Sequence, residues 1–157
     1  MDTNMQNEPN IPSNNEDKEF PKYYVCHLCT QAARKLVAYY NKVLAPMELT
    51  ANQVMALGVL WREEHVSLGE FARRAGMGKA AAVTMIKRLE AMGLVSRATN
   101  PRDARLNVIS LTEKARTMAP DVMGQVCRLE EALEEAVGVE NLENLVNGLA
   151  TIRDSEL

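Results

Sequence analysis

Cysteine and long apolar runs are scarce in this sequence, and each shortage excludes a class of protein. Its 157 residues include three cysteines, Cys26, Cys29 and Cys127, which are too few and odd in number for a disulfide framework. No apolar run approaches the roughly 20 residues of a membrane helix. Because the first residues are polar and acidic, we also expect no secretion signal and no membrane contact. These absences predict a cytoplasmic protein.

The usual parts of an active site are also missing. Only two histidines, His27 and His65, are available, and the sequence has neither a glycine-rich phosphate loop nor a nucleophile–histidine–acid set. Cys26 and Cys29 lie three residues apart in a predicted helix, with neither histidine placed to complete a zinc site. We therefore expect neither an enzyme nor a bound metal or cofactor.

The charge is distributed unevenly along the chain. Residues 71–116 hold ten lysines and arginines against three acidic residues, a local charge of +7, although the whole chain has a net charge of −3. Residues 117–157 hold two basic residues against nine acidic ones. A basic segment between acidic flanks favours an anionic partner, most commonly nucleic acid, and a merely solvated basic face is the alternative.

Apolar spacing predicts helices over residues 21–45, 50–61, 67–76, 79–92 and 112–137, and a last helix that carries Leu142, Leu145, Val146, Leu149 and Ile152. Capping boxes at Thr50–Gln53 and Ser67–Glu70 mark two of their starts, and Thr112 is expected to cap the fifth helix. Pro120 is expected to bend that helix. The period changes to two over 94–99 and 106–111, which predicts two strands joined by a polar loop, Asn100–Arg105.

This element order predicts a mainly α fold with a small β-hairpin wing (α+β), a winged helix-turn-helix. Gly76 and Gly78 permit the tight turn between the two short helices. The second of these, Lys79–Met92, is expected to enter the major groove of double-stranded DNA. Arg102 and Arg105, at the predicted hairpin tip, suit the backbone or a narrow minor groove, which attracts arginine.

The stretch from Leu49 to Arg116 resembles the MarR family of transcriptional regulators. The resemblance rests on Leu49-Thr50, Leu68-Gly69-Glu70-Phe71-Ala72, Lys87-Arg88-Leu89-Glu90, Gly93-Leu94-Val95, Asp103-Ala104-Arg105 and Leu111-Thr112-Glu113-Lys114. It implies a homodimeric regulator, expected to be a repressor, that binds a pseudo-palindromic operator and is released by an effector. The implied parts are a flexible arm (1–18), an N-terminal dimerisation helix (19–48), the winged region (49–116) and C-terminal dimerisation helices (117–157). The expected dimer core comprises Leu28, Leu36, Val126, Leu129, Leu133, Leu145 and Leu149.

Eight basic residues and one threonine of the winged region are the candidates for DNA contact. They are Arg73, Arg74, Lys79, Thr84, Lys87, Arg88, Arg97, Arg102 and Arg105. Asp103 is expected to support the wing by pairing with Arg105 or Arg102. The helix departs from the family at its first turn, where alanines replace hydroxyl side chains. Alanine methyls can contact thymine but cannot hydrogen-bond base edges, so discrimination is expected to depend also on DNA shape and the wing.

Two kinds of effector remain open. Cys26 matches the position of the reactive cysteine in the organic-hydroperoxide-sensing branch of the family, with Tyr40 of the partner subunit and Cys127 as its candidate partners. The alternatives are no ligand at all, or a small apolar or phenolic ligand in a cleft lined by Tyr23, Tyr24, Tyr39 and Trp61. Ordinary packing is the simpler role for these four residues. Two other functions also stay open: a winged helix that binds proteins, and a DNA protein without sequence preference.

Overall fold

The computed structural model describes the backbone of residues 24–100 and 103–156, with the side chains of those residues except 99–107. Its elements follow the predicted order. The helices are α1 (Val25–Leu44), a 3-10 turn η1 (Ala45–Met47), α2 (Ala51–Arg62), α3 (Leu68–Arg74), α4 (Lys79–Ala91), α5 (Glu113–Val137) and α6 (Val139–Asp154). The strands are β1 (Val95–Asn100) and β2 (Asp103–Leu111).

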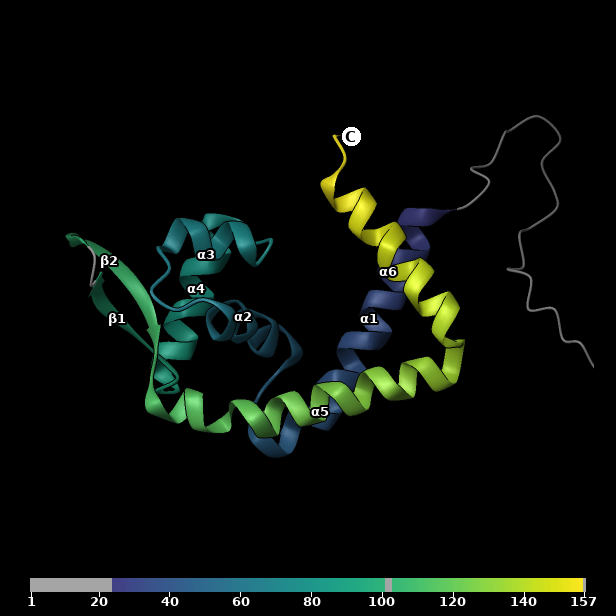
Figure 1. Ribbon diagram of the computed structural model, residues 1–157, viewed down its shortest axis with the longest axis horizontal. Coiled ribbons are helices and arrows are strands. Elements are labelled where there is room, and N and C mark those ends of the chain that lie inside the picture. Colours follow the sequence, from purple (N-terminus) through teal and green to yellow (C-terminus); the bar gives the residue numbers. More distant parts are fainter. Residues whose placement is uncertain (1–23, 101–102, 157) are drawn as a thin grey trace, which may run out of the picture.

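Figure 1 shows two groups of elements joined by α5. Helices α2, α3 and α4 and the β hairpin gather at one end of α5, and α1 and α6 lie towards its other end. Helix α5 is the longest, with 25 residues, and runs through Pro120 as one continuous element. We call the group of α2, α3, α4 and the β hairpin the winged unit. It is joined to the terminal helices α1 and α6 by the long helix α5.

Local signals set most helix ends. The Thr50 hydroxyl accepts a hydrogen bond from the backbone N–H of Gln53, and Oε1 of Gln53 accepts one from the backbone N–H of Thr50, which completes the predicted capping box. The Ser67 box is only half formed: Ser67 accepts from the Glu70 amide, but the Glu70 carboxylate turns instead to the arginines of its own helix. Gly93, at φ 69°, ends α4 in the left-handed conformation that glycine adopts easily.

The hairpin is an antiparallel two-stranded sheet that differs from the prediction at its tip. We expected a polar loop from Asn100 to Arg105, but β1 extends to Asn100 and β2 begins at Asp103, so Arg105 belongs to a strand. The register is regular from Val95, opposite Leu111, and shifts between Thr99 and Asn100. The expected loop was wrong because a two-stranded ribbon also accepts polar residues, so polarity does not mark where pairing ends.

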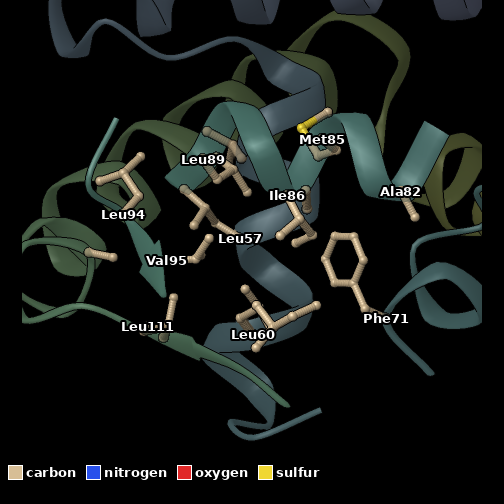
Figure 2. Packing of buried hydrophobic residues seen from close by; sticks show 14 of the residues in the cluster. Leu57, Leu60, Phe71, Ala82, Met85, Ile86, Leu89, Leu94, Val95 and Leu111 are labelled. Carbon is tan, nitrogen blue, oxygen red and sulfur yellow. The ribbon is translucent and has the colours of Figure 1, made fainter. Parts of the chain in front are cut away.

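One hydrophobic core joins the winged unit to the start of α5. Figure 2 shows its centre: Leu57 and Leu60 from α2, Phe71 from α3, the inner face of α4, and Leu94, Val95 and Leu111 from the hairpin. Burial of these side chains stabilises the unit by roughly 1.5–3 kcal/mol each. Ala115 and Val122 extend the core along α5, so the first turns of α5 pack as part of the winged unit.

Helix α6 contributes nothing to this core, because none of its 16 residues is buried. Within the described ranges, no single helix is long and apolar enough to cross a membrane. Only the bent pair Val25–Met47 and Ala51–Arg62, with a 76° bend, reaches that length and composition when both parts are taken together.

Candidate nucleic-acid interface

Helix α4 presents two different faces. Its inner face, with Ala82, Ile86 and Leu89, is buried in the core. Its outer face carries the exposed residues Lys79, Ala80, Ala81, Thr84, Lys87 and Arg88. The predicted recognition helix is therefore anchored by one side, and its cationic side is left accessible.

The three cations on α4 are available for a partner. Among the described residues, no ion pair includes Lys79, Lys87 or Arg88. An exposed cation without a carboxylate neighbour attracts phosphate at long range and can bind it directly. These residues are the strongest part of the predicted DNA-binding set.

The arginines of α3 are engaged differently. Arg73 donates to Glu70 through Nε and Nη2, at 2.9 and 2.6 Å. Arg74 pairs with both Glu70 and Glu63. The hydrogen bonds from Arg73 and Arg74 lower the pKa of the Glu70 carboxyl to about 2. Both arginines are exposed and still predicted to contact DNA, but each already has a carboxylate partner.

The residues of the wing are placed only in part. Arg97, on β1, is exposed, and its Nε lies 3.0 Å from Oε1 of Glu90 on α4. Arg102 lies outside the described residues, and so do the side chains of Asp103 and Arg105. The predicted support of the wing by Asp103 therefore stays a prediction.

The outer face of α4 is rich in methyl groups towards its N-terminal end. Ala80 and Ala81 are exposed, and Thr84 lies one turn beyond Ala80 on the same side. The Thr84 hydroxyl donates to the Ala80 carbonyl oxygen at 3.1 Å, so its hydrogen is used within the helix. This surface can offer apolar contacts flanked by Lys79 and Lys87.

Comparison with known proteins decides the family. The model of the MarR family matches residues 49–107. The HTH-type transcriptional regulator TtmR of Methylorubrum extorquens is 33% identical over 132 residues, which cover 83% of this chain and 66% of TtmR. The organic hydroperoxide resistance transcriptional regulator of Bacillus subtilis is 26% identical over 134 residues, covering 83% and 88%. The chain belongs to the MarR family.

A solved structure extends the likeness to a DNA complex. The transcriptional repressor CouR, bound to a 23-mer DNA duplex, superposes with a TM-score of 0.74 and 27% identity, over 87% of this chain and 99% of CouR. The relatives are helix-turn-helix regulators of transcription, so this MarR-family chain is a transcriptional regulator, as the winged region predicted. The chain spans just under two thirds of the length of TtmR.

The described cysteines and tyrosines of this MarR-family regulator lie on or beside α1 and on α5. Cys26 and Cys127 are exposed and Cys29 is half-buried. Tyr40 is half-buried against the core. Burial raises the pKa of the Tyr40 hydroxyl, and the charge of Glu130 on α5 raises it further. Tyr40 thus lies near the part of α5 that also carries Cys127, in the same protomer.

Of the four residues expected in an effector cleft, the three that the structure describes lie in different surroundings. Tyr24, just before α1, and Tyr39, on α1, are exposed, and Tyr23 lies outside the described residues. Trp61 packs against the core, and its Nε1 donates to the Ala115 carbonyl oxygen at 3.1 Å, which supports the simpler structural role. Residues of α1 instead line two open surface hollows. Tyr24 and Cys26 are among the residues that line the larger of these two hollows, which has a volume of about 610 Å³. No group of three potential metal ligands occurs in the described part of the chain.

Polar contacts between distant segments are what sequence reasoning missed. Glu63 and Glu64 were not singled out, yet they contact Arg74 and Arg116, which are 11 and 52 residues away.

Leu129, expected in the dimer core, is only 2% exposed in the single chain, so its own protomer already covers it. Nothing in the local spacing of these residues could have shown either result.

Proposed function

We propose that this regulator binds a pseudo-palindromic operator as a homodimer and represses transcription until an effector releases it. The observation that carries the proposal is the outer face of α4, with Lys79, Lys87 and Arg88 exposed and no carboxylate paired with them among the described residues. Each α4 would enter a major groove, with the two half-sites about one helical turn, roughly 34 Å, apart. The likeness to DNA-bound CouR supports this mode of binding.

The remaining predicted contacts follow from this placement. Thr84 and the α4 cations would face the bases and the phosphates, and Arg102 and Arg105 would contact the backbone or minor groove beside the wing. Arg73, Arg74 and Arg97 would contribute less, because they are paired with Glu70, Glu63 and Glu90. Such a regulator acts on chromosomal DNA without catalysis or a cofactor, in the cytoplasm.

The dimer is supported by the apolar surface of the terminal helices. Val25 and Leu28 on α1, with Leu145, Val146 and Ile152 on α6, are each about half exposed. Exposed apolar side chains gathered on helices with little burial indicate a missing partner surface. We therefore assign α1, α6 and the second half of α5 to dimerisation, and residues 49–116 to DNA binding.

The full chain tests the function directly. Fluorescence anisotropy would measure binding to DNA from upstream of its own gene, with excess unrelated DNA as competitor, and light scattering would give the mass in solution. We expect competitor-resistant binding by a dimer. Binding that unrelated DNA removes equally well would point to a protein without sequence preference, and a monomer at micromolar concentration would contradict the dimer. Binding to no DNA would favour the protein-interaction module.

A second candidate function is thiol-based sensing of organic peroxide. Cys26 is exposed, and one relative is named as an organic hydroperoxide resistance regulator. Under this reading the Cys26 thiolate would be oxidised to a sulfenic acid, with Cys127 or the partner subunit's Tyr40 nearby. Cys26→Ser should keep DNA binding and lose release by cumene hydroperoxide, whereas normal release would remove Cys26 as the sensor. Release by a phenolic compound instead would favour a small ligand bound along α1.

A further inference from the structure

The first turn of α5 contacts the winged unit through several hydrogen bonds. The Thr112 hydroxyl donates to the carbonyl oxygen of Gly93, just after α4, at 2.7 Å. The Ala115 carbonyl oxygen accepts from the Trp61 indole of α2. These contacts fix the base of α5 to the ends of α2 and α4.

Arg116 adds a contact of a different kind. Its Nε and Nη2 donate to Oε1 and Oε2 of Glu64 at 2.9 and 2.8 Å, a two-point pairing across 52 residues of sequence. The hydrogen bond from Arg116 lowers the pKa of the Glu64 carboxyl. Two parallel hydrogen bonds fix the orientation of both groups, as well as their distance. Glu64 lies in the loop between α2 and α3, so the pair ties that loop to α5.

The same loop also contacts two further elements, α3 and β2. Glu63 pairs with Arg74 on α3. His65 lies 2.7 Å from Ser110 on β2, between Nδ1 and Oγ, and the Val66 carbonyl oxygen accepts from the Ile109 amide of β2 at 2.8 Å. Four consecutive residues thus contact α3, α5 and β2. A displacement of this loop would move α3 and the wing together.

We propose that Glu64 and Arg116 are positioning residues for DNA binding. Their pair holds the α2–α3 loop, and through it α3 and the wing, in a fixed orientation on α5. This inference rests on the proposed function, because the second half of α5 is there assigned to the dimer. In such a dimer the pair limits how far α3 and the wing can shift relative to α5, and so sharpens the preference for one half-site spacing.

An ordinary surface ion pair would behave differently. Arg116 and Glu64 are 42% and 34% exposed in their side chains, and exposed pairs contribute little to folding stability. A pair that only stabilised the fold would change the unfolding midpoint and leave the spacing preference of the folded protein unchanged. The spacing preference is therefore the decisive measurement.

The chain offers a matched control for Glu64. Glu113 also faces Arg116, 3.6 Å away, but it lies on α5 itself and is 86% exposed. Glu64→Gln and Glu113→Gln each remove one carboxylate beside Arg116, and only the first breaks a link between elements. Both full-length variants would be titrated with operators whose half-site spacing is changed by one or two base pairs. We expect Glu64→Gln to reduce the discrimination between spacings by about threefold, and Glu113→Gln to leave it as in the wild type.

Charge reversal provides the rescue. Glu64→Arg should relax the spacing preference, and adding Arg116→Glu should restore it, with circular dichroism showing that each variant is folded. Equal spacing profiles for Glu64→Gln and Glu113→Gln, or no rescue in the double variant, would overturn the positioning role. If the wild type binds the operator but prefers no spacing, the positioning role is wrong, and the proposed function as a DNA-binding regulator is unaffected. If the wild type binds no operator at all, the proposed function fails with it.

Discussion

Lys114, in the first turn of α5, donates a hydrogen bond from Nζ to the carbonyl oxygen of Met92, 3.0 Å away at the C-terminal end of α4. The last carbonyl groups of a helix have no partner within the helix and carry partial negative charge. The Lys114 ammonium satisfies one of them. Helix α5 therefore closes the end of the recognition helix, opposite to the end that carries the methyl-rich turn.

Removing this contact should loosen the end of α4. We expect Lys114→Met to lower the free energy of unfolding by up to about 1 kcal/mol, because one charge-assisted hydrogen bond is lost at an exposed site. Urea unfolding followed by circular dichroism would measure the change. Lys114→Arg keeps a cationic donor and is the control. Equal losses in both variants would show that the contact with Met92 does not contribute.

The ion pairs of α3 lead to a prediction about salt. Lys79 has no carboxylate partner among the described residues, whereas Arg73 is paired with Glu70. The logarithm of the affinity falls as the logarithm of the salt concentration rises, and each phosphate contact makes this slope steeper by roughly 0.9. We expect Lys79→Ala to reduce this slope by about one, and Arg73→Ala to change it by much less. Titrations at several salt concentrations measure both slopes, and a larger change for Arg73→Ala would reverse the assignment.

Local chemistry made much of the fold predictable. The capping box of Thr50 and Gln53 and the Thr112 cap depend on neighbours within four residues, and both form as predicted. The tip of the hairpin was not predictable in this way. Its polar residues suit a loop and a strand equally, so only the pairing of Asn100 with Asp103 decides between them.

The candidate site was predictable in composition and not in pairing. Sequence pattern placed Lys79, Lys87 and Arg88 on one helix, and the structure exposes all three. It gave no sign that Arg74 would share Glu63 and Glu70, since one of these partners lies 11 residues away beyond a loop. The charge of a segment therefore overstated the number of cations available to DNA, because it counts paired and unpaired cations alike.

The low pKa of Glu70 predicts a change of stability with pH. In the folded protein the hydrogen bonds from Arg73 and Arg74 lower the pKa of Glu70 from its ordinary value of 4.5 to about 2. A carboxyl whose pKa is lowered by folding stabilises the protein above its unfolded pKa, and this contribution is lost as the pH falls towards the folded pKa. The stability difference between wild type and Glu70→Gln should therefore be full above about pH 4.5 and shrink towards pH 2. Thermal unfolding at pH 6 and pH 3 measures it, and a difference independent of pH would contradict the pairing.

The methyl-rich turn of α4 predicts what the operator presents to it. Ala80 and Ala81 are exposed and the Thr84 hydroxyl hydrogen is used within the helix, so this turn suits apolar contacts, such as the C5 methyl group of thymine. Replacing thymine by uracil removes that methyl and leaves the hydrogen-bonding edge unchanged. We expect uracil at the half-site positions facing α4 to weaken binding by about three- to tenfold. This loss corresponds to the free energy of burying a methyl group, roughly 0.8 kcal/mol or more. Uracil outside the half-sites is the control. Equal affinity for both substituted operators would show that α4 reads its site without these methyl groups, and would leave specificity to the α4 cations, the wing and DNA shape.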